Sequence, residues 1–340
     1  MTRMPKREMT SPPLPRKLQV EVTAACNLSC QMCIVHYRPA LPRSASMSFG
    51  EFQRLLDSLP SVEHLVLQGI GEPLLAPDLL RMVEYAKQRG IFVEFNTNAT
   101  LLSRETGRRL IEAGLDALHI SLDGASKETY ETIRERARWE QVEANIRAFL
   151  DEVKAHGAGR PGISLVMVLM RRNLRELPEL VGLAAEWGIP ELFVQNLSHD
   201  FSDAPAAAYQ EISDFVSRET VLMLPREEVA TVFAEASKKA RELGVRLRLP
   251  NLSGPGRPPE LAGRRVGCDW PWQGGYVSSN GSVLPCCMVM GSDRISMGNL
   301  KGSSFQEIWK GKAFRDFRQR LLDGSPHPVC RGCSLYRGRF

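Results

Sequence analysis

Three cysteines close to the start of the chain have the spacing of a metal-cluster site. They are Cys26, Cys30 and Cys33, in the order C-x3-C-x2-C. An ordinary electron-transfer [4Fe–4S] cluster is held by four cysteines, so three thiolates leave one iron without a protein ligand. A small molecule can bind at such an open iron. Zinc would need a fourth ligand, for which His36 is available, and that alternative stays open at this point.

Similar polar and glycine-rich segments follow other apolar runs of the chain. Gly69-Ile70-Gly71-Glu72-Pro73 follows the second run, and its glycines let the backbone approach a ligand closely. Asn98 follows the third run, whereas Ser121 and Asp123 end the fourth. The alternatives are an ordinary Gly-Pro turn and helix caps at Ser121 or Asp123.

Two further polar residues complete this set. Arg134 lies one predicted helix after Asp123, and its planar guanidinium suits a carboxylate ligand, although a solvated arginine is the alternative. Asn196 ends the sixth apolar run.

The elements that must position these residues follow a regular alternation of apolar runs and amphipathic helical patterns. We expect strands at residues 18–23, 64–68, 92–97, 117–121, 163–170 and 192–196. We expect helices between them at residues 48–58, 77–89, 104–113, 127–136, 140–154 and 173–187, with Gly90, Gly114 and Gly188 as helix ends. Six strands in βα alternation predict an α/β fold with a parallel sheet, a partial (β/α)6 TIM-like barrel. In such folds chemistry gathers at the C-terminal ends of the strands, where the cysteine segment lies.

The chain divides into three predicted parts. Residues 1–17 read as a disordered leader, residues 18–250 as the barrel, and residues 251–340 as a small cysteine-rich extension. A helix at 226–243 and a possible short strand at 245–249 close the barrel, and residues 251–259 form a Pro/Gly-rich linker. The extension is expected to contain a hairpin of residues 275–278 and 282–284 around Asn280-Gly281, then two short helices.

Composition limits the possible functions. The 340 residues are 43% apolar and 24% charged, with a formal net charge of +5, as expected of a globular protein. No apolar run reaches membrane-spanning length, and the first 17 residues lack the apolar core of a Sec signal. Basic residues are not interleaved with aromatic ones, so we expect no nucleic-acid partner. Eight cysteines without an export signal favour metal or redox ligands in the cytoplasm over disulfides.

Together, the cysteine triad and the strand-end motifs resemble the radical S-adenosylmethionine (SAM) superfamily. In that family the SAM amine and carboxylate chelate the open iron, and one electron releases a 5′-deoxyadenosyl radical. The resemblance implies that Cys26, Cys30 and Cys33 hold this [4Fe–4S] cluster. Met32, where the family often has an aromatic residue, would pack beside adenine.

The resemblance also assigns the other strand-end residues to SAM. Gly69, Gly71 and Glu72 match the family's G-G-E-P segment, which binds the methionine ammonium, with Ile70 at the first glycine's place. The residues matched to the ribose hydroxyls, the carboxylate or the adenosine of SAM are Asn98, Ser121, Asp123, Arg134 and Asn196.

Five further cysteines lie in the last quarter of the chain. Cys268, Cys286, Cys330 and Cys333 resemble the ligands of SPASM and twitch extensions, which carry auxiliary iron–sulfur clusters. One fully ligated auxiliary [4Fe–4S] cluster, as in a twitch extension, accounts for four of the five, and a zinc ribbon is the alternative. Cys287 is then spare, either as a buried structural thiol or as a catalytic hydrogen-atom donor; swapped roles for Cys286 and Cys287 stay open.

The resemblance implies a radical SAM oxidoreductase or epimerase acting on a small molecule. Twitch relatives include aminocyclitol dehydrogenases and aminoglycoside epimerases, and Cys26 comes early for a leader-peptide-binding module to precede it. We therefore expect a carbohydrate-like substrate, with a flavodoxin or ferredoxin as electron donor. The alternatives are a peptide-modifying radical SAM enzyme and a non-catalytic iron–sulfur or zinc regulatory protein.

Overall fold

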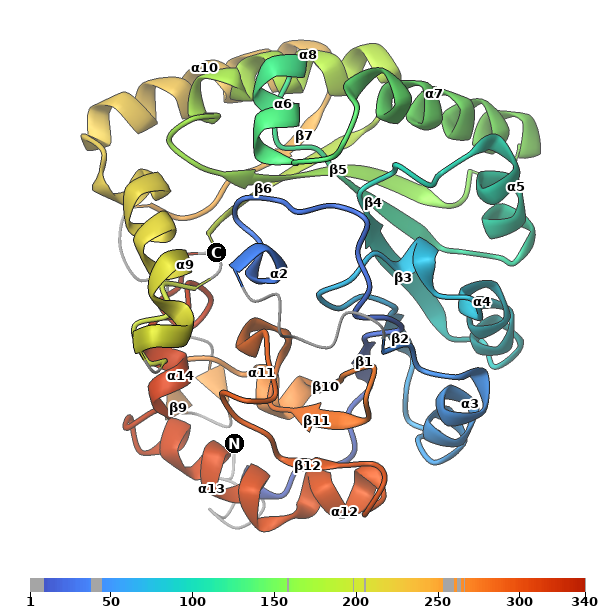
Figure 1. Ribbon diagram of the computed structural model, residues 1–340, viewed down its shortest axis with the longest axis vertical. Helices are drawn as coiled ribbons and strands as arrows, with labels where there is room; N and C mark the ends of the chain where they lie inside the picture. Colours follow the sequence, from blue (N-terminus) through green and yellow to red (C-terminus); the bar gives the residue numbers. More distant parts are fainter. Residues whose placement is uncertain are drawn as a thin grey trace.

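A curved ten-stranded sheet is the framework of the molecule (Figure 1). The computed structural model describes residues 9–37, 45–157, 159–197, 199–204, 206–252, 260–261, 264–265 and 267–339. The strand order is β12-β11-β10-β1-β2-β3-β4-β5-β6-β7, and the pairs from β10 through β7 are parallel. Figure 1 shows α3, α4, α5, α7, α8 and α10 on the outside of the curve and α2 within it.

The strands of this sheet are β1 (Lys17–Val20), β2 (His64–Val66), β3 (Phe92–Thr97), β4 (Ala117–Ser121), β5 (Gly162–Leu169), β6 (Glu191–Asn196), β7 (Arg246–Arg248), β10 (Gly274–Val277), β11 (Ser282–Leu284) and β12 (Gly298–Asn299). A separate pair consists of β8 (Glu260–Leu261) and β9 (Arg264–Arg265).

The helices of the barrel are α2 (Ile34–Tyr37), α3 (Phe49–Asp57), α4 (Leu79–Gln88), α5 (Arg104–Glu112), α6 (Lys127–Ile133), α7 (Trp139–His156), α8 (Leu177–Trp187), α9 (Ala206–Glu219) and α10 (Arg226–Leu243). The C-terminal helices are α11 (Trp270–Gln273), α12 (Phe305–Lys310), α13 (Lys312–Leu322) and α14 (Pro328–Arg331). Short 3-10 turns are η1 (Pro73–Leu75), η2 (Leu174–Glu176), η3 (Val221–Met223) and η4 (Cys287–Val289). Among the described helices, none has the combined length and apolar character needed to cross a bilayer.

Local sequence signals explain where the crossover helices begin and end. Ser48 and Glu51 form a reciprocal capping box at the start of α3, and Ser103 caps α5 in a similar way. Gly188 ends α8 in the left-handed conformation, with φ of 73°, which a residue with a side chain rarely adopts. The six predicted barrel strands and the α/β partial barrel are confirmed, and the possible strand at 245–249 is present as β7.

The C-terminal part extends the barrel sheet. The predicted hairpin is present as β10 and β11, but β10 also pairs in parallel with β1, Lys17 opposite Gly274 and Val20 opposite Val277. The apolar core is likewise continuous from the barrel strands to Val283 and Trp309. Residues 253–259 of the predicted linker lie outside the described residues.

The expectation of a disordered segment over residues 1–17 is wrong for its second half. Residues 1–8 lie outside the described residues, but Met9 is buried and its carbonyl accepts a hydrogen bond from the Trp272 indole. The Trp309 indole donates to the Pro13 carbonyl at 2.9 Å. This proline-rich segment leaves these two backbone carbonyls without a partner in a helix or strand, so the indole N–H groups of the two C-terminal tryptophans act as their donors.

A fully buried arginine fastens the same segment from the other side. Arg318 donates through Nη1 to the Thr10 and Trp309 carbonyls and through Nε to the Pro271 carbonyl. Its guanidinium lies 4.1 Å from the centre of the Trp309 ring. Burial lowers the pKa of Arg318 to about 9, and no described carboxylate forms an ion pair with it. The guanidinium is therefore held by backbone dipoles and aromatic faces.

We predict that Arg318→Ala destabilises the protein by about 3–5 kcal/mol, because it opens a cavity and leaves three buried carbonyls without donors. Arg315→Ala, an exposed position on the same helix, is the matched control and should cost under about 1 kcal/mol. Denaturant unfolding of both variants measures the difference. Equal stabilities would show that residues 9–13 are not fastened by Arg318.

Candidate active site and cluster sites

The Cys26–Cys33 loop lies at the C-terminal end of β1 and is fastened to the segment that follows α6. The Gln31 amide donates to the Ile133 carbonyl at 2.9 Å, and the Ser29 amide donates to the Glu135 carbonyl at 3.2 Å. Burial raises the pKa of Cys26 to about 11 and of Cys30 to about 12, and the neighbouring thiols of the loop raise both further. The structure thus brings the three predicted ligands together on one loop. Without metal these thiols stay protonated, so binding a cluster must release protons.

A buried ion pair lies directly beside Cys30. Arg134 Nη2 is 2.7 Å from Asp123 Oδ2, and Arg134 Nη1 donates to the Cys30 sulfur at 3.9 Å. Asp123 is fully buried, and its Oδ1 accepts from the Val168 amide at 2.7 Å. Both charged groups thus have protein partners, and direct contact of Asp123 and Arg134 with SAM stays a prediction. They hold β4, β5 and the cysteine loop together.

Glu72 joins its own turn to the end of β3 through hydrogen bonds. Its carboxylate is buried and accepts from Thr97 Oγ1, the Asn98 amide and the Leu74 amide, at 2.7, 2.8 and 3.2 Å. Burial raises the pKa of this carboxyl, against the lowering effect of those hydrogen bonds. The Asn98 amide nitrogen Nδ2 donates to Asn27 Oδ1 at 3.0 Å, so Asn98 also links β3 to the cysteine loop.

The two glycines of this turn allow a close approach of backbones. A Cβ on Gly71 would lie 2.4 Å from the Thr23 carbonyl oxygen and 2.5 Å from that of Ala25. A Cβ on Gly69 would lie 2.1 Å from the Glu21 side chain. Only glycine fits at either place, so the glycine turn is packed directly against the start of the cysteine loop.

Sequence reasoning missed Glu21, which joins three parts of the site. Its Oε2 accepts from the Ile70 amide at 3.0 Å and from the Tyr276 hydroxyl at 2.8 Å. Its Oε1 accepts from the amide and the hydroxyl of Ser279, at 3.1 and 2.7 Å. A small cavity of about 50 Å³ lies here, lined in part by Glu21, Ala24, Ile70 and Ser279. The signal in the sequence that could have identified Glu21 is an acidic residue at the end of an apolar run.

The remaining predicted SAM contacts divide into two groups. Met32 is partly buried in the same apolar cluster as Cys33 and Ile70, and Ser121 ends β4 half-buried. Asn196 is buried at the end of β6, and its Nδ2 donates to the Arg339 carbonyl at 2.6 Å, although its Oδ1 has no partner among the described residues. Asn196 therefore holds the C-terminal segment through Nδ2, and its expected contact with adenosine stays a prediction.

Four of the five C-terminal cysteines converge on one small cavity. Cys268, Cys286, Cys330 and Cys333 line a space of about 20 Å³ together with apolar side chains, whereas Cys287 does not line it. Burial raises the pKa of Cys268 to about 12 and that of Cys286 well above its usual value. Cys286 therefore lines the cavity and Cys287 does not, which agrees with the prediction that one of the five C-terminal cysteines is not a cluster ligand.

Cys287 is nevertheless close to the set, because after burial it is Cys333 that raises the pKa of the Cys287 thiol. Burial, Glu21 and then Cys287 raise the pKa of the Tyr276 hydroxyl. Burial also raises the pKa of Cys287 itself to about 12. The thiol is therefore protonated at neutral pH, which a hydrogen-atom donor requires; that role stays a prediction.

A second network that the sequence did not reveal seats the Cys330–Cys333 loop. The Arg294 guanidinium pairs with Asp203 and lies 3.0 Å from His199 Nε2. Burial and then Arg294 lower the pKa of His199 to about 4, so this histidine stays neutral. His199 also forms an isolated β-bridge with Cys333. The segment after β6 thereby positions the closing cysteine pair.

The donor sets suit iron–sulfur clusters. Three thiols beside a glycine cradle leave one cluster iron open, and four thiols around one cavity leave none.

A family model of the radical SAM superfamily matches residues 20–184 of the chain. A second, for the SPASM iron–sulfur cluster-binding domain, matches residues 268–334. The fold and both cysteine sets define the same class of protein. The chain belongs to the radical SAM superfamily and carries a C-terminal SPASM domain, so its cofactors are SAM, a [4Fe–4S] cluster and an auxiliary iron–sulfur cluster.

Relatives of assigned activity match nearly the whole chain. A tungsten-containing aldehyde ferredoxin oxidoreductase cofactor-modifying protein of Pyrococcus furiosus is 27% identical, over 94% of this chain and 87% of the relative. An AdoMet-dependent heme synthase of Methanosarcina barkeri is 27% identical, over 94% and 91%. A PqqA peptide cyclase of Xanthomonas campestris is 27% identical, over 96% and 81%.

Solved structures share the fold. Streptococcus suis SuiB bound to its precursor peptide SuiA matches with a TM-score of 0.71 and 15% identity, covering 98% of this chain and 72% of SuiB. SuiB bound to S-adenosylmethionine matches with a TM-score of 0.67 and 15% identity, covering 96% and 72%.

We predict that Gly71→Ala loses the SAM-site cluster, because the added methyl group meets two backbone carbonyls that cannot move aside. Iron after anaerobic reconstitution should fall from about eight per chain towards about four. Gly302→Ala, whose Cβ would meet nothing within 4 Å, should keep the full content. Full iron content in the Gly71→Ala variant would contradict this, because it would show that the glycine turn can move away from the cysteine loop without loss of the cluster.

The adjacent cysteines of the SPASM domain provide a matched pair. We predict that Cys286→Ala reduces iron from about eight to about four per chain, whereas Cys287→Ala keeps about eight, because only Cys286 lines the four-cysteine cavity. Iron analysis and electron paramagnetic resonance of the reduced proteins measure this. The reverse pattern would make Cys287 the ligand and end its candidacy as a hydrogen-atom donor.

Proposed function

We propose that the chain is a peptide-modifying radical SAM enzyme. The observation that carries the proposal is its match, over 96% of its length, to a PqqA peptide cyclase. The SuiB fold, which has been seen with a precursor peptide bound, is consistent with it. This replaces the carbohydrate-like substrate as the leading hypothesis, because one of the three reported relatives is named for a peptide reaction and none for a sugar or aminocyclitol.

The chain's own residues have separate tasks in the proposed reaction. Cys26, Cys30 and Cys33 hold the SAM-site cluster, and the Asp123–Arg134 pair orients Cys30. When bound, this cluster supplies the electron that cleaves SAM, so that the deoxyadenosyl group can take a hydrogen atom from the peptide. Glu72 and Gly71 fix the turn beside the methionine end of SAM.

The SPASM cysteines serve the second half of the proposed reaction. Cys268, Cys286, Cys330 and Cys333 leave no open iron, so the auxiliary cluster can accept an electron but cannot bind the peptide. Oxidation of the peptide then needs only the loss of a proton to solvent. A reduced flavodoxin or ferredoxin would provide the priming electron. The alternative to oxidation is that the Cys287 thiol donates a hydrogen atom back to the peptide, which would give epimerisation.

We predict that hydrogen moves from a peptide to 5′-deoxyadenosine. The substrates are perdeuterated peptides encoded by short reading frames that flank the gene, incubated with reconstituted enzyme, SAM and dithionite. Mass spectrometry of the 5′-deoxyadenosine should detect deuterium, because the abstracted atom stays on the 5′ carbon. A Cys30→Ala variant, which lacks one ligand of the SAM-site cluster, should form no 5′-deoxyadenosine.

The control substrates are perdeuterated aminocyclitols and porphyrin precursors, offered in the same way. Deuterium transfer from one of these and from no peptide would overturn the proposal in favour of a small-molecule enzyme. Failure to cleave SAM at all, in protein of full iron content, would overturn every enzymatic hypothesis.

A further inference from the structure

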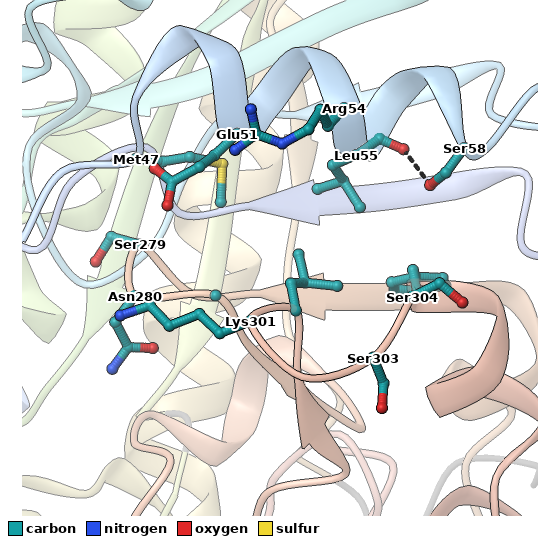
Figure 2. Close-up of a pocket in the computed structure, with 13 residues that line it drawn as sticks. Met47, Glu51, Arg54, Leu55, Ser58, Ser279, Asn280, Lys301, Ser303 and Ser304 are labelled. Carbon is teal, nitrogen blue, oxygen red and sulfur yellow. Dashed lines mark hydrogen bonds between the residues drawn. The ribbon is translucent and has the colours of Figure 1, made fainter.

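A groove of about 280 Å³ separates the barrel from the SPASM domain (Figure 2). One wall is a single face of α3, with Glu51, Arg54 and Leu55 along it, and Met47 just before the helix. The other wall is the β10–β11 tip and the turn between β12 and α12. The Gln306 side chain donates to the Ser58 carbonyl at 2.9 Å and fastens the two walls at one end.

The floor and the rim of this groove differ in chemistry. Leu55 and Phe305 are buried apolar floor residues. Arg54, Lys301 and Asn280 are exposed at the rim, and Figure 2 shows Lys301 beside Asn280 on the SPASM wall. An apolar floor with a polar rim is the usual composition of a site that binds part of a peptide.

The hydrogen-bonding groups at the rim are mainly donors. Arg54 and Lys301 form no ion pair among the described residues, unlike Arg81 and Arg147 on other crossover helices. Asn280 uses its Oδ1 to accept from Ser278 and Ser282, which leaves its Nδ2 group to donate.

The one carboxylate of the groove is already engaged. Glu51 accepts from the Ser48 amide and hydroxyl in the capping box, and these bonds lower its pKa, with smaller contributions from Arg54 and Lys301. The groove therefore presents two cations and an amide donor to any ligand, and it favours one with carboxylates.

The groove also shares a wall with the small cavity beside the glycine turn. Ser279 and Asn280 line both the groove and the small cavity that contains Glu21, Ile70 and Ala24. Glu21 holds Ser279 through two hydrogen bonds, so this shared wall is fixed to the end of β1. A chain lying in the groove needs to cross only this tip to reach the loops that carry the SAM-site cysteines.

We propose that the groove binds an acidic segment of the peptide substrate, with Arg54 and Lys301 as its charge contacts. This inference rests on the proposed function for the identity of the ligand. The apolar floor takes the side chains between the acidic residues, and the Ser279–Asn280 tip leads the segment towards the reaction centre. The groove would then contribute to substrate recognition without touching the reacting atoms.

The test compares two double variants of equal net charge. Arg54→Gln/Lys301→Gln removes the rim cations, and Lys154→Gln/Arg241→Gln removes two exposed cations near the ends of α7 and α10. The probes are a fluorescein-labelled Glu-rich peptide and the same peptide with Gln at each Glu. Fluorescence anisotropy at low salt measures their affinities for each reconstituted holoenzyme.

The wild type and the Lys154/Arg241 control should prefer the Glu-rich probe by about tenfold, as two exposed ion pairs can provide, and the rim variant should lose that preference. Preference that persists in the rim variant, or that is absent from the wild type, overturns the inference. A peptide found by deuterium transfer adds a second readout, since its KM should rise in the rim variant with kcat unchanged. An unchanged KM would overturn the groove assignment alone, whereas absent deuterium transfer with retained probe preference would overturn only the proposed function.

Discussion

The buried carboxylate of Glu21 is the interaction on which the arrangement of the site depends. A carboxylate removed from water is costly unless donors replace the lost hydration, and Glu21 has four of them. The donors come from the glycine turn, from β10 and from the β10–β11 tip. Because the four donors belong to three segments, satisfying one side chain fixes the positions of the barrel and the SPASM domain relative to each other. The cysteine loop starts five residues further along the chain and takes its place from this junction.

Buried carboxylates with protein partners also lie beside both sets of cysteines. Asp123 with Arg134 lies beside Cys30, and Asp203 with Arg294 lies beside the Cys330–Cys333 loop. A buried ion pair adds little net stability compared with apolar packing, but breaking one partner leaves an uncompensated charge. Such pairs therefore specify position more than they stabilise. Segments that must present thiols in one geometry need this kind of constraint, since Cys26–Cys33 lies outside the regular elements and Cys330 lies only in the short helix α14.

Much of this arrangement was accessible from the sequence because it depends on local patterns. β3 and β4 lie at the predicted residues, and the cysteine loop, the glycine turn and the β10–β11 hairpin follow from spacing and turn residues. Pairing between distant segments was not accessible. The β1–β10 pairing joins residues about 257 positions apart in the register Lys17 to Gly274, and no periodicity records it. The packing of Met9 and Thr10 on the SPASM domain and the Arg294–His199 contact were hidden for the same reason.

Polar residues near strand ends show what a motif indicates and what it leaves open. A motif indicates that Asp123, Arg134 and Asn196 lie near the reaction centre, and the structure places them at the ends of β4 and β6 or next to the cysteine loop. It does not indicate whether a polar group faces the ligand or the protein. That depends on whether a neighbouring segment supplies a partner, and here the Val168 amide, the Cys30 sulfur and the Arg339 carbonyl do so. The buried charges therefore maintain the backbone shape around the cysteine loop, whereas contact of these residues and of Ser121 with SAM stays a prediction.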